Sequence, residues 1–113
     1  MNTRRTAIFF KDTQNKREPA KDWLEKLRDR VGQAAVFVRI ARAETGNFGD
    51  WKSVGDGVME MRISVGPGYR LYYAFDGQDV ILLLLGGDKS TQSKDIQKAK
   101  EFWESHKTRK KRG

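Results

Sequence analysis

The chain has 113 residues, a length that buries one hydrophobic core, and we therefore expect a single domain. It has 23 Lys and Arg against 15 Asp and Glu, and the formal net charge of +8 favours a polyanionic partner such as nucleic acid. The lack of cysteine excludes disulfides and thiolate metal sites, and a single histidine excludes histidine-rich ones, so we expect neither a metal nor a cofactor.

The sequence shows no sign of a membrane segment. The amino end, Met-Asn-Thr-Arg-Arg, lacks the apolar run of a signal peptide. No segment approaches the roughly 18 apolar residues that a membrane span requires. We expect a cytoplasmic protein that does not contact a membrane.

The first half of the chain predicts a short strand at residues 6–11 and then two helices. Glu18-Pro19 suits a helix start, because proline lacks the N–H that the first turn leaves unpaired. We expect Gly32 to separate the two helices and Gly46 to cap the second. The stripe expected to be buried in the second helix is Ala34, Phe37, Val38, Ile40 and Ala41.

The second half predicts three strands, at residues 58–64, 69–75 and 80–85, after a turn-rich connection at 47–57. Gly-Pro-Gly and Asp-Gly turns join these strands, which favours antiparallel pairing. Residues 80–85 are apolar throughout, as in a strand covered on both faces. A final helix is expected, capped by Ser90 or Ser93. Its apolar stripe is Ile96, Ala99, Phe102 and Trp103.

These elements predict an α+β fold, in which a small twisted antiparallel sheet of about four strands packs against an N-terminal helical hairpin and is followed by a C-terminal helix. We expect one domain over residues 1–106. Residues 107–113 carry five cations and no acid, and we expect a flexible basic tail there. Such a tail binds nucleic acid by counterion release, and Lys107, Arg109 and Lys110 are its candidate RNA contacts.

Polar, mostly cationic side chains share one face of the predicted sheet. Alternation places Glu60 and Arg62 on the same face of their strand, and it places Arg70 and Tyr72 together on the next strand. Lys89 follows the last strand, beside Asp88. Two arginines, a lysine and two acids converging at one end of a sheet suit a polyanion whose charge changes during reaction.

Two further side chains are candidate RNA contacts. Tyr72 shares the face of Arg70 and is a candidate for stacking on a base, and Lys94 lies early in the final helix. The only histidine, His106, lies at the root of the tail, where a structural role is the simpler interpretation.

Three segments, taken in order, resemble the RelE/ParE superfamily of type II toxins and within it the HigB-like addiction module killer branch. They are residues 59–63, 66–73 and 84–92, followed by Lys94-Asp95-Ile96 and Ala99, and the likeness spans about 6–104. The resemblance implies a RelE-like fold and a bacterial or phage origin. It also implies a cognate antitoxin, in this branch often a helix-turn-helix protein.

The resemblance leaves two toxin mechanisms open. One kind of member is an mRNA interferase, a metal-independent endoribonuclease that cleaves translated mRNA on the ribosome, and the other inhibits DNA gyrase. A non-catalytic RNA-binding or protein-binding member is the third alternative. The basic positions of the RNA-cutting members fall on Arg62, Arg70 and Lys89, so we expect the nuclease. Arg70 and Lys89 would then stabilise charge on the phosphoryl oxygens while Arg62 holds the phosphate in line.

Proton transfer is less well provided for. Some members place a lysine where Glu60 stands and a tyrosine near Asp95, and this chain has neither. We expect Glu60 first and Asp88 second to accept the proton of the ribose hydroxyl, and Lys89 or Lys94 to donate to the leaving oxygen.

Overall fold

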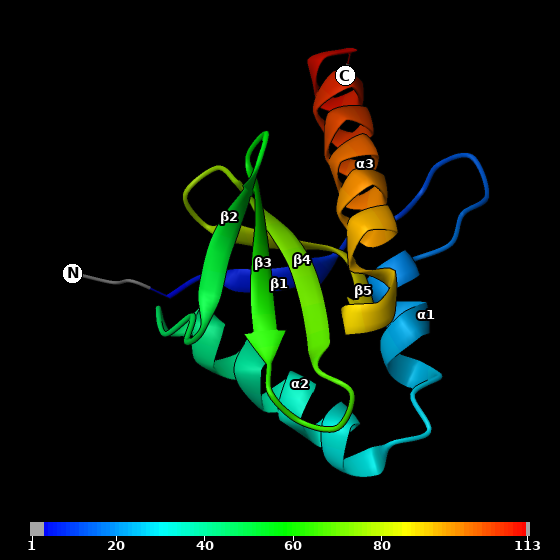
Figure 1. Cartoon of the computed structure of the whole chain (residues 1–113). Coiled ribbons are helices and arrows are strands. Elements are labelled where there is room, and N and C mark those ends of the chain that lie inside the picture. Colours follow the sequence, from blue (N-terminus) through cyan, green and yellow to red (C-terminus); the bar gives the residue numbers. More distant parts are fainter. Residues whose placement is uncertain (1–3, 113) are drawn as a thin grey trace.

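The computed structural model describes residues 4–112, which form a five-stranded mixed sheet with three α-helices (Figure 1). In chain order the elements are β1 (Thr6–Phe9), α1 (Pro19–Glu25), α2 (Arg30–Glu44), β2 (Trp51–Gly55), β3 (Val58–Ile63), β4 (Tyr69–Asp76), β5 (Val80–Asp88), the short 3-10 turn η1 (Lys89–Thr91) and α3 (Gln92–Arg112). The α+β class and the C-terminal helix are confirmed.

The sheet has the order β1-β5-β4-β3-β2. Strands β2 to β5 pair antiparallel as consecutive neighbours, whereas β1 pairs parallel to β5. The prediction of about four antiparallel strands is therefore corrected to five in a mixed sheet. Strand β2 was predicted as a connection. Most of its side chains are exposed, so its sequence does not show the alternation of apolar and polar residues by which a half-buried strand is recognised.

Helices cover both faces of the sheet. Helices α1 and α2 lie on one face, and α3 lies on the other. Strand β5 contributes to both cores, as its continuous apolar run predicts, with Ile81 and Leu83 on the first face and Leu82 and Leu84 on the second.

The N-terminal helices differ from the predicted hairpin. Helix α1 starts at Pro19 as expected, but it ends at Glu25 and packs mainly against β5. Helix α2 begins after Asp29, whose carboxylate accepts a hydrogen bond from the Gly32 N–H. Gly32 thus lies in the first turn of α2, where the ring of Tyr69 leaves no room for a side chain.

Most of the stripe predicted to be buried in α2 faces the wrong way, and only Ile40 packs partly buried against the core. Phe37 and Val38 are 50% and 46% exposed, and Ala34 and Ala41 are exposed as well. The buried positions of α2 are Gly32, Val36 and Ala43. Apolar residues occur on both sides of this helix, so spacing alone did not indicate which side meets the sheet.

Helix α3 runs without interruption to Arg112, so the expected flexible tail is corrected to the last turns of a helix, with Gly113 outside the described residues. A domain boundary at residue 106 stays a prediction. The predicted stripe of Ala99, Phe102 and Trp103 is buried. Among residues 4–112, no helix is both long and apolar enough to cross a membrane.

Candidate functional site

A cavity of about 500 Å³ opens at the end of the sheet where β3 turns into β4. Its walls are formed by residues 62–64 and 66–70 together with Asp50 and Lys89. The three basic residues predicted to meet, Arg62, Arg70 and Lys89, all line it. Its volume lies in the range of about 300–1,000 Å³ that is usual for small-molecule sites.

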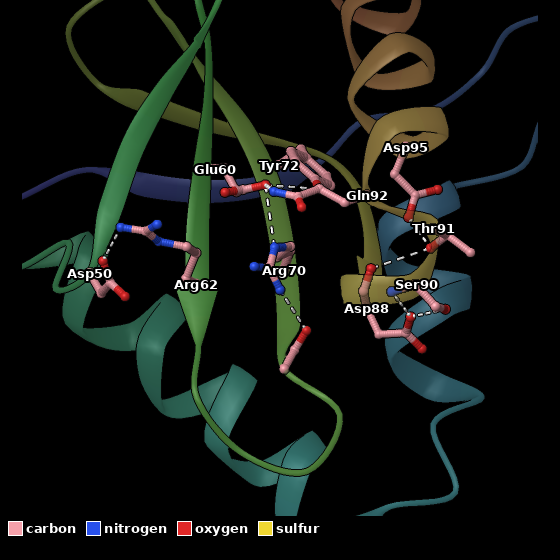
Figure 2. A network of polar contacts seen from close by, with 11 residues as sticks. Asp50, Glu60, Arg62, Arg70, Tyr72, Asp88, Ser90, Thr91, Gln92 and Asp95 are labelled. Carbon is pink, nitrogen blue, oxygen red and sulfur yellow. Dashed lines mark hydrogen bonds and ion pairs between the residues drawn. The ribbon is translucent and has the colours of Figure 1, made fainter.

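The two arginines lie directly opposite each other, because Arg62 of β3 and Arg70 of β4 are register partners on the same face of the sheet. Like charges in such a cross-strand pair are destabilising. Figure 2 shows that the two side chains turn apart, Arg62 toward Asp50 and Arg70 toward Glu60. The flanking acids therefore offset the repulsion between the two guanidinium groups.

Of the two arginine–acid pairs at the site, Arg62 with Asp50 is the exposed one. Arg62 Nη2 lies 2.7 Å from Asp50 Oδ1, and the two side chains are 37% and 52% exposed. Water screens such a pair, which contributes only about 0–1 kcal/mol. An anion that enters the cavity could therefore replace Asp50 as the partner of the Arg62 guanidinium at little cost.

Arg39 of α2 holds the backbone beneath this pair. Its guanidinium donates hydrogen bonds to the carbonyl oxygens of Arg62 at 2.6 Å, Phe48 at 3.0 Å and Asp50 at 3.1 Å. Burial lowers the pKa of Arg39, against the opposing effect of Asp50. These bonds tie the loop that carries Asp50 to the end of β3 and so position the acid beside Arg62.

Arg70 with Glu60 is the buried one of the two arginine–acid pairs. Glu60 is fully buried, and its Oε2 accepts hydrogen bonds from the Tyr72 hydroxyl at 3.0 Å and from Gln92 Nε2 at 2.9 Å. The same oxygen lies 3.5 Å from Arg70 Nε, and Arg70 Nη1 donates to the carbonyl of Gly68 at 3.0 Å. Burial and the neighbouring Glu60 carboxylate raise the pKa of Tyr72, which therefore stays a hydrogen-bond donor.

Unsatisfied polar atoms concentrate at this site. Within residues 4–112, the buried side-chain atoms that lack a hydrogen-bond partner are Glu60 Oε1, Arg62 Nε and Arg70 Nε. The 3.5 Å contact between Arg70 Nε and Glu60 Oε2 is an ion pair and not a hydrogen bond, so it leaves Nε without a partner. Buried polar groups are nearly always paired, and exceptions gathered in one place are typical of functional sites.

Lys89 lies exposed at the start of η1, on the rim of the cavity. The preceding residue, Asp88, caps this turn, because its carboxylate accepts hydrogen bonds from the Ser90 N–H at 2.8 Å and from the Ser90 hydroxyl. These bonds lower the pKa of Asp88. Asp88 thereby places Lys89 at the mouth of the site, and the cap predicted for the final helix at Ser90 or Ser93 stays a prediction.

Three predicted site roles are corrected by this geometry. Tyr72 is fully buried and cannot stack on a base. Glu60 is fully buried too, so it supports Arg70 and cannot meet a ribose hydroxyl. The hydrogen bonds of Asp88 with Ser90 fix its carboxylate in the cap, and it does not contribute to the cavity wall.

The other predicted RNA contacts lie away from the cavity. Lys94 is exposed on the first turns of α3. Lys107, Arg109 and Lys110 lie near the far end of this 21-residue helix, about 30 Å long, at the opposite end from the site (Figure 1). Lys110 pairs with Asp76, which also contacts His106 at 2.8 Å, so these groups tie α3 to β4.

Asp50 is the site residue that the sequence interpretation missed. It precedes β2, a strand that was not predicted, and the register that pairs Trp51 with Met61 brings Asp50 beside Arg62. A turn-rich segment next to a cationic strand was the signal available, but side-chain alternation does not report on strands whose side chains are mostly exposed.

The sequence model of the family described as Phage derived protein Gp49-like (DUF891) matches residues 22–104, and the chain belongs to this family. An uncharacterized protein of Haemophilus influenzae is 51% identical over 78 residues, which are 69% of this chain and 79% of the relative. No solved structure matches the chain.

The family identified from the three sequence segments is therefore wrong. The matching family is the Gp49-like one, a distinct group from the RelE/ParE superfamily and its HigB-like branch. The short segments indicate strands with alternating polar residues and glycine turns, which is a property of local structure and does not by itself identify a family. Within residues 4–112, no group of three or more His, Cys, Asp or Glu side chains is arranged to hold a metal ion.

Proposed function

We propose that the chain is the toxin of a toxin–antitoxin pair and acts as an endoribonuclease that cleaves translated mRNA on the ribosome. A cognate antitoxin, of the helix-turn-helix type, would hold it inactive. The observation that carries the proposal is that Arg62, Arg70 and Lys89 all line one open cavity. Two like charges placed directly opposite each other weaken a sheet, so their presence favours an anionic ligand as the reason for them.

The three cations suit cleavage of an RNA phosphodiester. The ribose 2′-oxygen attacks the adjacent phosphorus while the bond from phosphorus to the 5′-oxygen breaks, leaving a 2′,3′-cyclic phosphate and a 5′-hydroxyl. Negative charge grows on the phosphoryl oxygens during this step. Arg70, held by Glu60 and Gly68, presents a preorganised guanidinium to that charge. In this scheme Arg62 binds the phosphate after leaving Asp50, and Lys89, which lines the same cavity, donates to the leaving 5′-oxygen.

Proton transfer falls to Asp50 in this scheme. It is the acid on the cavity wall, and a phosphate that binds Arg62 releases its carboxylate to accept the proton of the 2′-hydroxyl. A free carboxylate is a weak base at neutral pH. The alignment of the 2′-oxygen with phosphorus must therefore supply much of the rate, which is why we expect the ribosome to be needed to orient the mRNA.

The test uses purified ribosomes programmed with a defined mRNA, with cleavage followed by mapping new 5′ ends. Replacing Lys89 or Arg62 by alanine should lower the cleavage rate about 100-fold or more while leaving the thermal midpoint unchanged. Arg70→Lys should also lower the rate, because lysine lacks the planar fork of donors. Lys26→Ala, an exposed change beside α1 on the other face of the sheet, is the matched control and should remain fully active.

Asp50→Asn separates binding from chemistry. RNA affinity should be kept or increased, because Arg62 loses its competing acid, whereas cleavage should slow. If the wild-type protein produces no new 5′ ends with or without ribosomes, the nuclease proposal is refuted. A parallel gyrase supercoiling assay tests the alternative target, and tight RNA binding without cleavage would instead identify a non-catalytic RNA-binding protein.

A further inference from the structure

Helix α2 carries an apolar surface that faces away from the sheet. Its residues are Val31, Ala34, Phe37, Val38 and Ala41, all exposed, and we call them the outer face of α2. Positions 31, 34, 38 and 41 follow the helical repeat, and position 37 lies one turn from 34 and 41. The buried residues Val36 and Ala43 point the opposite way, into the core.

This outer face is large for an exposed helix. Val31, Phe37 and Val38 are 70%, 50% and 46% exposed, and they are three of the five large hydrophobic side chains that are exposed among residues 4–112. A surface helix of a globular protein normally turns charged and polar residues to water, whereas a helix that is apolar on both sides is normally buried on both sides. A contiguous exposed apolar patch marks an interaction site.

Charge around the outer face favours one kind of partner. Arg30 and Arg42 are exposed at its two ends. The acid of α2, Glu44, is already engaged, because its carboxylate accepts the backbone N–H of Ala7 at 2.8 Å. The rim is thus cationic around an apolar centre. An antiparallel contact between two copies would bring the arginines of both copies together, and like charges at an interface oppose association.

We propose that the outer face of α2 binds an amphipathic helix of a partner protein, one whose apolar stripe is flanked by Asp and Glu. From Val31 to Ala41 the outer face is about 15 Å long, which matches nearly three turns of a docked helix. The surface lies on the sheet face opposite to α3 and away from Arg62 and Arg70, so the partner can dock while the cavity stays open. This proposal stands apart from the one on RNA cleavage.

The probe is a labelled 18-residue helical peptide with leucines at i, i+3, i+4 and i+7 spacing and glutamates on both flanks. A peptide with lysines in place of the glutamates and one with scrambled leucines are its controls. The full chain should bind the acidic peptide saturably in fluorescence anisotropy, with affinity that falls as salt is added. Neither control peptide should bind comparably. In ¹⁵N spectra, the amide shifts should change along residues 30–44.

Variants locate the contact and separate apolar from charge effects. Phe37→Ser with Val38→Ser should weaken binding about tenfold or more, whereas Trp51→Ser, a similarly exposed aromatic on β2, should leave it unchanged. Arg30→Glu with Arg42→Glu should weaken binding, whereas the charge-matched pair Lys111→Glu with Arg112→Glu, at the end of α3, should not. Circular dichroism should show that each variant keeps its fold, because the replaced side chains are exposed.

Four results would overturn the proposal. One is the absence of saturable binding, and another is equal binding of the lysine peptide. The third is a dimer of the wild-type chain in sedimentation equilibrium that is lost in the variant carrying both Phe37→Ser and Val38→Ser. The occupant of the outer face would then be a second copy of the chain. Amide shift changes confined to the cavity residues would likewise overturn it, because the acidic peptide would then bind at the cavity and not at the outer face of α2.

Discussion

Replacing Glu60 by alanine should destabilise the fold strongly even though Glu60 is not expected to touch substrate. Its carboxylate is fully buried beneath Arg70, whose side chain is 13% exposed, and it accepts hydrogen bonds from Tyr72 and Gln92. Alanine would leave a nearly buried guanidinium without its counter-charge. It would also leave the buried Tyr72 hydroxyl and the part-buried Gln92 amide without an acceptor.

The size of the effect follows from these contacts. Removing one partner of a buried ion pair costs about 3–5 kcal/mol, and each stranded donor costs about 1–3 kcal/mol, although the costs overlap and do not add. A domain of this size has about 5–15 kcal/mol of stability in total. With a urea dependence of about 1–3 kcal/mol per molar, the midpoint of Glu60→Ala should fall by about 2 M.

Urea unfolding followed by tryptophan fluorescence measures this change, since the chain has three tryptophans. Glu101→Ala is the control, because Glu101 pairs with Lys98 on the surface of α3, where solvent screens the pair and the change should lie within about 0.5 kcal/mol. Glu60→Ala combined with Arg70→Ala should be less destabilised than the two single changes predict together.

A midpoint shift below about 0.5 M for Glu60→Ala would refute the reasoning. It would mean that water or a rearranged side chain reaches Arg70 and Tyr72, and that Glu60 is not the group that preorganises the arginine. If the destabilisation of the double variant Glu60→Ala with Arg70→Ala equals the sum of the two single changes, Glu60 and Arg70 do not stabilise each other, and the reasoning is refuted as well.

Three further predictions address packing, charge and the end of α3. Gly86→Ala should destabilise by about 1–3 kcal/mol and alter tryptophan emission, because the added methyl group would clash with the ring of Trp23; unchanged emission would contradict this close contact. Hydrogen bonds from Lys110 and His106 lower the pKa of Asp76, so its stabilising contribution is present above pH 4 and is lost as pH falls through the lowered value. Asp76→Asn should therefore melt earlier than wild type at neutral pH, and the difference should shrink only as pH falls below about 4 and through the lowered pKa; a difference that stays constant in acid would contradict the linkage. Deleting residues 107–113 should weaken RNA affinity and flatten its salt dependence, as measured by filter binding at several salt concentrations, whereas unchanged binding would show that these cations do not contact RNA.

Much of the sheet could be predicted because side-chain alternation is a local property of an extended chain. The alternation of residues 59–63 and 69–73 correctly placed Glu60, Arg62 and Arg70 on one face, and the apolar run of β5 correctly indicated burial on both faces. The Asp76-Gly77 turn correctly indicated an antiparallel pair.

Alternation assigns a residue to a face but does not say how deeply the residue is buried on that face. Glu60 and Arg62 are two residues apart on the same face, yet Gln92 at the start of α3 covers Glu60 and leaves Arg62 open to solvent. The roles predicted for Glu60 and Tyr72 failed for this reason. Burial depends on which helix crosses the strand and where that helix begins, and these are contacts between segments that lie far apart in the chain.

The sequence by itself determined the strands β3 to β5, the hairpin turns between them, the apolar stripe of α3 and the cations that share one face. Only the tertiary structure decided the partner of each cation, the pairing of the outer strands β1 and β2, and the side of α2 that meets the sheet. The physical reason is that backbone geometry sets the direction of each side chain within its own element. The environment that the side chain enters is set by the packing of other elements against it.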